Sequence, residues 1–338
     1  SYVGLMHIYE GFGWSIERGR RFIDEAERIA REHDDCAALG WVTTIRGVAS
    51  TSLGAWRVSI EQIDEGVALL RARTVGTRWE QTAGLSTALL SLAAMGQIDS
   101  LRLRALELER ESSEVGDVFG EVEASLYLSF ADLAADGPDR ARQRIAEAMG
   151  RWTHEAFHFQ HWTALRYRTF CDLYTGVSDE TARRLEVGVR AAREARLFDN
   201  QIVRGEASLL EGLVCLADLA RGAADQRALE RRVDRAAIKL GRERRAWAAA
   251  SAWCLRGSLA EACGDRDRAI AALRKAREMF VGAHMGLHAT VAKLRLGELL
   301  PGAAGKSLVT EAREQMMKAH GIAEPERWCN VYLPGPRR

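Results

Sequence analysis

The feature that most constrains this chain is a triplet of small, large and small residues that recurs at intervals of about 40 positions. The members of each triplet are four and three positions apart, which places them on one face of a helix. Successive triplets begin 40, 42, 40, 40, 48 and 40 residues apart. They are Gly19-Ile23-Ala26, Ser59-Ile63-Gly66, Leu101-Ala105-Leu108, Ala141-Ile145-Ala148, Thr181-Leu185-Gly188, Leu229-Val233-Ala236 and Ala269-Leu273-Ala276. The triplets that begin at Leu101 and Leu229 are poor in small residues. Helical units of this kind cannot bury their apolar faces alone, so they must stack on one another.

The clearest unit runs from Trp253 to Ala276 and has the residue order of two paired helices. Large and small residues alternate where the helices would cross, and Gly264 lies where a left-handed backbone ends the first helix. This order resembles a tetratricopeptide repeat (TPR), with longer helices. The pattern predicts an all-α, TPR-like α-solenoid of about eight antiparallel helical hairpins with a period of about 40 residues. We expect the hairpins at residues 1–34, 35–76, 77–116, 117–156, 157–197, 198–241, 242–283 and 284–320, followed by a C-terminal tail over 321–338.

Composition narrows the range of partners. The 48 basic and 47 acidic residues give a net charge of +1, so no general attraction to nucleic acid or to anionic lipid is expected.

No run of about 18 apolar residues is present, so the sequence predicts no transmembrane helix. None of the six cysteines forms a C-x-x-C motif, which favours a reducing, cytoplasmic location over a disulfide framework. The chain also begins without Met inside an amphipathic pattern, so we interpret it as a fragment of a longer protein.

The inner, concave surface of such a solenoid is lined by the first helix of each hairpin. Counting back from the triplets predicts its exposed positions, which mix aromatic residues with both signs of charge, a lining suited to a protein or peptide. Aromatic members of this set could equally pack between helices. The predicted partner-binding residues are Trp41, Glu123, Phe130, Arg166, Phe170, Tyr174, Glu211, Asp218, Arg221 and Glu261.

One motif suggests a metal site. His154-Glu155-Ala156-Phe157-His158 matches H-E-x-x-H, which on one continuous helix would bind zinc, and His161 adds a third imidazole. The repeat register, however, places this motif across a junction between helices, where the histidines need not share a face. Leu300 occupies the first glycine position of a P-loop-like segment, so no nucleotide site is expected. We therefore predict no metal, no cofactor and no catalytic residue, and keep a zinc hydrolase as an alternative.

Several segments resemble the C-terminal repeat region of large bacterial signalling proteins that join a serine/threonine kinase, an AAA/STAND-type ATPase and a TPR array. The segments are Gly54-Ala55-Trp56, Trp79-Glu80, Leu101–Arg104, Phe157–Trp162, Asp172–Gly176, Gly321–Arg327 and Leu333–Gly335. The resemblance implies that kinase and ATPase modules precede this chain in its parent. It also implies that the repeats regulate them as a sensor or docking arm.

The sequence thus favours a non-catalytic scaffold or sensor domain. Its expected partner is a protein or peptide, including the ATPase and kinase modules of its own parent. A second alternative is a helical-repeat receptor for a peptide or small-molecule signal, which requires an enclosed pocket.

Overall fold

The computed structural model describes residues 1–73, 75–153 and 155–335. Throughout these residues the regular structure is helical, with seventeen α-helices and one short 3-10 helix, η1. The helices are α1 (Tyr2–Glu10), α2 (Gly13–Glu32), α3 (Cys36–Ser52), α4 (Trp56–Arg73), α5 (Arg78–Met95), α6 (Ile98–Val115), α7 (Val118–Ala134), α8 (Pro138–Arg151), α9 (Phe159–Thr175), α10 (Asp179–Glu194), η1 (Leu197–Asp199), α11 (Gln201–Ala220), α12 (Gln226–Arg242), α13 (Ala246–Ala262), α14 (Arg266–Gly282), α15 (Gly286–Leu299), α16 (Gly302–His320) and α17 (Pro325–Tyr332).

Local sequence explains where many of these helices begin and end. The carboxylate of Asp35 accepts a hydrogen bond from the backbone N–H of Ala38 and so caps α3, and Asp265 caps α14 in the same way. Gly96 and Gly116 end α5 and α6 in the left-handed conformation, which glycine adopts at little steric cost. The prediction of an all-helical chain is confirmed within the described residues.

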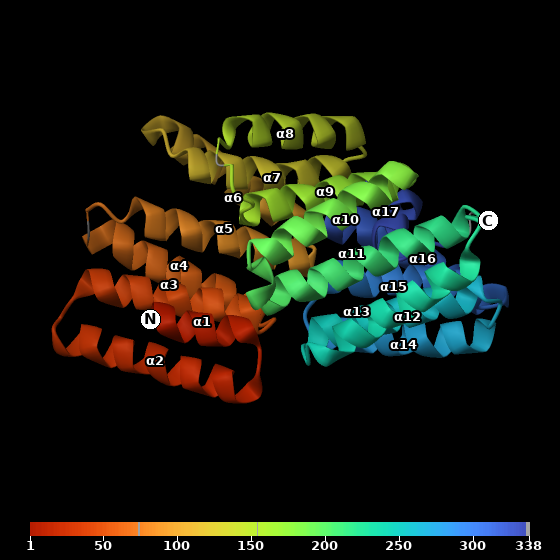
Figure 1. The fold of residues 1–338 in the computed structure, drawn as a ribbon, viewed down its shortest axis with the longest axis horizontal. Coiled ribbons are helices and arrows are strands. Elements are labelled where there is room, and N and C mark those ends of the chain that lie inside the picture. The colour runs from red at the N-terminus through yellow and green to blue at the C-terminus, as the bar shows by residue number, and fades with distance from the viewer. Residues whose placement is uncertain (74, 154, 336–338) are drawn as a thin grey trace.

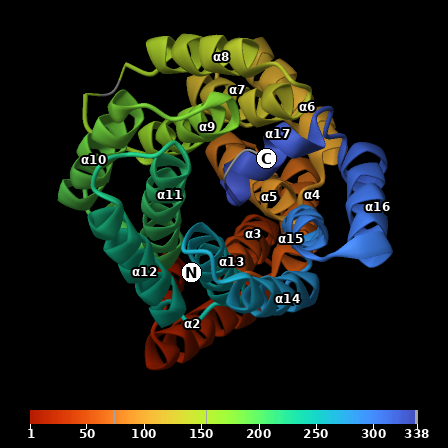
Figure 2. The same ribbon diagram turned by 90° about the vertical axis from the view of Figure 1, so that its right-hand side faces the viewer.

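The helices form two layers that follow chain order (Figure 1). Each helix from α1 to α16 packs against the next one, and odd-numbered helices also pack side by side from α1 through α13. The even-numbered helices α8, α10, α12, α14 and α16 lie outside them (Figure 2). This arrangement is consistent with a helical-repeat solenoid.

The recurring triplets lie at the contacts between the two layers. All seven fall on even-numbered helices, from α2 to α14. In α8, Ala141, Ile145 and Ala148 are 0%, 4% and 0% exposed. The small side chains of Ala141 and Ala148 therefore let α8 approach its inner neighbours closely.

The array of helices curves back on itself, so that α1 lies against α11 and α5 against α15 and the helices surround a central space, which we call the ring (Figure 2). Arg245 donates to the backbone oxygen of Gly11 at 3.1 Å, and Gln201 donates to that of Ile8 at 3.1 Å. Gly96 packs so tightly on α15 that an added Cβ would lie 2.1 Å from Cβ of Leu287. These contacts join the N-terminal helices to α11, α13 and α15 and close the ring.

Six free cysteines are distributed over the helices, and four of them are buried. Among the described residues, no helix combines the length and the apolar content that crossing a bilayer requires.

Candidate binding site on the inner face

The C-terminal helix α17 lies inside the ring, against the inner faces of α9, α11 and α15. Trp328 and Tyr332 are one helical turn apart and point to the same face of α17, because residues four positions apart align along a helix. Trp328 is fully buried and Tyr332 is 8% exposed. The segment that the sequence predicts as a tail is therefore seated on the predicted groove.

Three of the predicted groove residues form the seat for these two rings. The ring of Trp328 lies 5.3 Å from that of Phe130 and 6.4 Å from that of Tyr174, centroid to centroid. Tyr332 lies 5.6 Å from Phe170 in an edge-on arrangement. Aromatic pairs at these distances add a stabilisation of about 1 kcal/mol each beyond the area that they bury.

Polar contacts fix the start of α17 at the edge of this aromatic seat. Arg327 donates to the carboxylate of Asp136 at 2.5 Å, and the Tyr174 hydroxyl donates to the same oxygen at 2.7 Å. The guanidinium of Arg327 lies 4.4 Å from the centre of the Tyr174 ring. The backbone N–H of Ala323 donates to the oxygen of Ala134 at 2.9 Å. Both apolar and polar contacts therefore hold α17 in place.

A buried ion pair lies beside the seat. Arg166 on α9 donates through Nη1 to Glu206 on α11, and the indole N–H of Trp162 donates to the other oxygen of Glu206 at 2.7 Å. The two charged side chains are 8% and 14% exposed. Because both carboxylate oxygens have a donor, Glu206 is satisfied where it is, and the pair links two inner helices.

A second carboxyl group, that of Glu123 on α7, is also buried, and its pKa is shifted. Burial raises the pKa of Glu123 to about 7, although the hydrogen bond from Gln160 at 2.8 Å and the nearby Arg166 lower it. The carboxyl of Glu123 is therefore substantially protonated near neutral pH. Glu123 is 6% exposed, so it is a buried residue of the core and does not line an open groove.

Glu123→Gln is expected to stabilise the protein at alkaline pH by about 3 kcal/mol and to have little effect at pH 4. A folded-state pKa of about 7 against an ordinary value of 4.5 means that the folded protein binds more protons between these values. The free energy of unfolding of the native chain should therefore fall as pH rises from 4.5 to 7. Denaturant unfolding at pH 4 and pH 8 measures this, and the surface variant Glu114→Gln, which keeps Glu123, should retain the pH dependence of the native chain.

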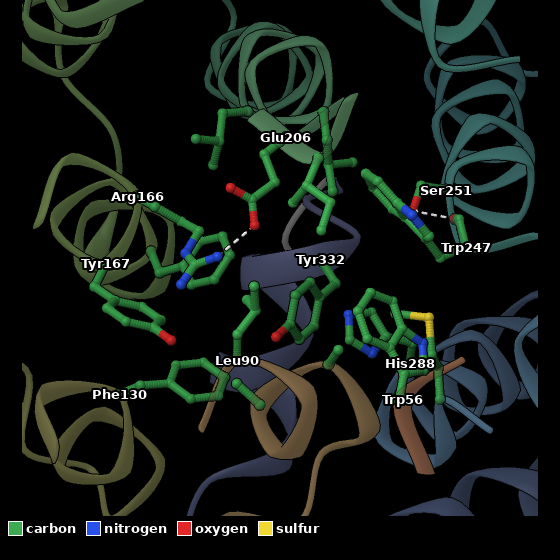
Figure 3. A pocket seen from close by; sticks show the side chains of 17 residues that line it. Trp56, Leu90, Phe130, Arg166, Tyr167, Glu206, Trp247, Ser251, His288 and Tyr332 are labelled. Carbon is green, nitrogen blue, oxygen red and sulfur yellow. Dashed lines mark hydrogen bonds and ion pairs between the residues drawn. The ribbon is translucent and has the colours of Figure 1, made fainter. Parts of the chain in front are cut away.

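A small cavity remains between the ion pair, Tyr332 and the inner helices (Figure 3). Its volume is about 80 Å³, and its walls come from α4, α5, α7, α9, α11, α13, α15 and α17. Phe130, Arg166 and Phe170 line it together, so the ring brings these three predicted residues to one place. Trp56, Trp247 and His288 form the opposite wall (Figure 3).

The remaining predicted residues lie elsewhere. Trp41 packs against Tyr2 and Trp79 near the N-terminus, with ring centroids 5.5 and 5.8 Å away. Glu211 and Asp218 of α11 line a separate cleft, whose other walls come from α10 and α12. Glu211 follows the cavity residue Leu210 directly, so its side chain points about 100° away from that of Leu210 around the helix.

Two further predicted residues form ion pairs outside the cavity. Arg221 donates to Asp218 at 2.8 Å at the end of α11. Glu261 lies 3.7 Å from the buried Arg295 of α15. These residues therefore do not share a site with Arg166.

The H-E-x-x-H motif lies at the junction before α9. His154 is outside the described residues. The backbone N–H of His158 donates to Nδ1 of His161 at 3.1 Å, so this ring nitrogen takes part in capping α9. Within the described ranges, no group of three or more His, Cys, Asp or Glu side chains is placed to hold a metal ion.

Sequence reasoning missed α17 and the cavity residues Trp56, Trp247 and Tyr332. A signal for α17 was present: Pro325 suits the first turn of a helix, and Trp328 and Tyr332 have helical spacing. Their position on the inner face depends on the curvature of the helix array, which no local sequence pattern predicts.

Comparisons with known proteins add no relative. No protein-family model matches the sequence, and a search of curated proteins gives no match. The functional inference therefore depends on the contacts described above.

Proposed function

We propose that this chain is a non-catalytic, TPR-like repeat domain whose inner face binds short aromatic helices of a protein partner. The observation that carries this proposal is the seating of α17 on Phe130, Phe170 and Tyr174. Recognition of a helix by anchors one turn apart in an apolar groove is a common mode of peptide binding. We therefore expect the partner to present a helix that resembles α17 of this chain.

The repeat assignment within this proposal has its own support. From α3 onward, the inner helices α3, α5, α7, α9, α11, α13 and α15 begin 42, 40, 41, 42, 45 and 40 residues apart. The buried triplets lie on the outer helices between them. This regular spacing fits hairpins that each contribute one helix to the inner face.

The resemblance to kinase–ATPase–TPR signalling proteins suggests which partner is relevant. We infer that α17 competes with a helical segment of the parent's kinase or ATPase modules, or of another signalling protein, for the same seat. Release of α17 would then couple partner binding to regulation. An intramolecular helix competes at an effective concentration near millimolar, so the free partner must bind well to displace it.

Peptide binding to the full chain tests this proposal. Trp328→Ala together with Tyr332→Ala should vacate the seat, and a fluorescein-labelled peptide of residues 321–335 should then bind at least about 100-fold more tightly than to the native chain. Fluorescence anisotropy measures the affinity. The control pair Tyr2→Ala and Trp14→Ala removes exposed aromatic rings and should leave binding at the native level.

A vacated variant that keeps native helical circular dichroism yet binds the peptide no better than the native chain would contradict the proposal. A peptide carrying Ala at positions 328 and 332 should not bind either protein.

A further inference from the structure

The cavity beside α17 is lined mainly by residues of other helices. Its lining is mostly aromatic and aliphatic, and Leu90 and Tyr332 lie near its centre (Figure 3). Its volume of about 80 Å³ exceeds the roughly 30 Å³ that one water molecule occupies in the liquid. It is smaller than the cavities of about 150 Å³ that take up benzene, so a bound molecule has to be small.

Several donors in the cavity wall have no partner. The indole nitrogens of Trp56 and Trp247 are buried, and no acceptor among the described residues lies within hydrogen-bonding distance of either. These residues are 4% and 6% exposed. Buried donors are normally paired. The unpaired donors around this cavity, which also include Nε and Nη2 of Arg166, therefore indicate an acceptor that occupies it.

The charges around the cavity balance. Arg166 and Glu206 are the two charged residues of its lining, and they form an ion pair. Burial lowers the pKa of His288 to about 3, so this imidazole is neutral at physiological pH. An ion brought into this space would lose its hydration without a counter-charge, which disfavours charged ligands.

We infer that this cavity binds a small, uncharged, largely apolar molecule that carries a hydrogen-bond acceptor such as a carbonyl oxygen. The aromatic walls contact the apolar body of the ligand, and the indole N–H groups of Trp56 and Trp247 donate to the acceptor. The cavity adjoins the helix seat and shares Phe130 and Phe170 with it, but Tyr332 of the seated helix forms part of its wall and Trp328 does not.

Three matched probes test the inference on the ¹⁵N-labelled full chain. They are acetone, isobutene with the same shape but no acceptor, and isopropylamine, which is a cation at pH 7. Indole N–H signals are assigned with Trp56→Phe and Trp247→Phe. Acetone should move both assigned signals downfield and saturate with a Kd of about 1 mM. The hydrocarbon and the amine should bind at least about tenfold more weakly.

Cavity-filling variants serve as controls. Leu90→Phe should abolish the acetone shifts, and Ala94→Leu provides a second filling variant if the first one loses its helical circular dichroism. The exposed Trp14 should give no saturable shift in any experiment.

Equal affinity for the ketone and the hydrocarbon would overturn the inference, since the cavity would then select by shape alone. Absence of a saturable shift with all three probes would overturn it as well and would assign the cavity to water. Because α17 stays in place throughout, these outcomes do not depend on peptide binding at the helix seat.

Discussion

Arg166→Ala is expected to lower the free energy of unfolding by about 3–5 kcal/mol. The truncation leaves the carboxylate of Glu206 buried with the indole of Trp162 as its remaining described donor. The loss reflects an uncompensated charge in a medium of low dielectric more than the strength of the ion pair itself. Urea unfolding followed by far-UV circular dichroism measures the change.

A matched surface pair and a double variant separate these two contributions. Arg110→Ala removes an exposed arginine that lies 2.6 Å from Glu114, and it should change stability by less than about 1 kcal/mol. Arg166→Met combined with Glu206→Gln removes both charges and keeps an acceptor for Trp162. This double variant should recover most of the lost stability. If Arg166→Ala were as mild as Arg110→Ala, the pair would not hold the inner helices together.

Local sequence predicts the helical class of this protein well because the relevant forces act over one or two turns. Ala141, Ile145 and Ala148 become buried at helix crossings, as their spacing indicates. Gly96 and Asp35 end and start helices where their backbone and side-chain chemistry favour it. Such features depend on neighbours three or four residues away, so one sequence suffices to find them.

The candidate site is harder to predict because it forms where distant segments meet. Trp56, Trp247 and Tyr332 line one cavity although they belong to α4, α13 and α17. Their meeting depends on the small rotation between successive hairpins, which accumulates until the ring closes. Repeat counting predicts Phe130 and Phe170 for the inner face, but the residues that they contact, Trp328 and Tyr332, lie beyond the last triplet. A pattern within each hairpin contains no information about that closure.

Trp328→Ala is expected to release α17 from the ring while the other helices stay folded. Removing a fully buried indole from its contacts with Phe130 and Tyr174 should weaken the docking of α17 by about 3–5 kcal/mol. The loss is local because α17 is the last helix and no later helix of the described chain packs on it. Undocked conformations should therefore become about 150- to 5,000-fold more frequent.

Cys329 reports this release directly. Its thiol is 4% exposed on α17, and burial raises its pKa, so it should react slowly with a disulfide reagent in the native chain. The exposed Cys263 should react quickly and provides an internal reference. In Trp328→Ala the labelling rate of Cys329, measured by mass spectrometry, should rise about 100-fold or more, whereas Trp14→Ala should leave it unchanged. A native labelling rate for Cys329 in Trp328→Ala would mean that contacts other than the indole, such as Arg327 with Asp136, keep the helix seated.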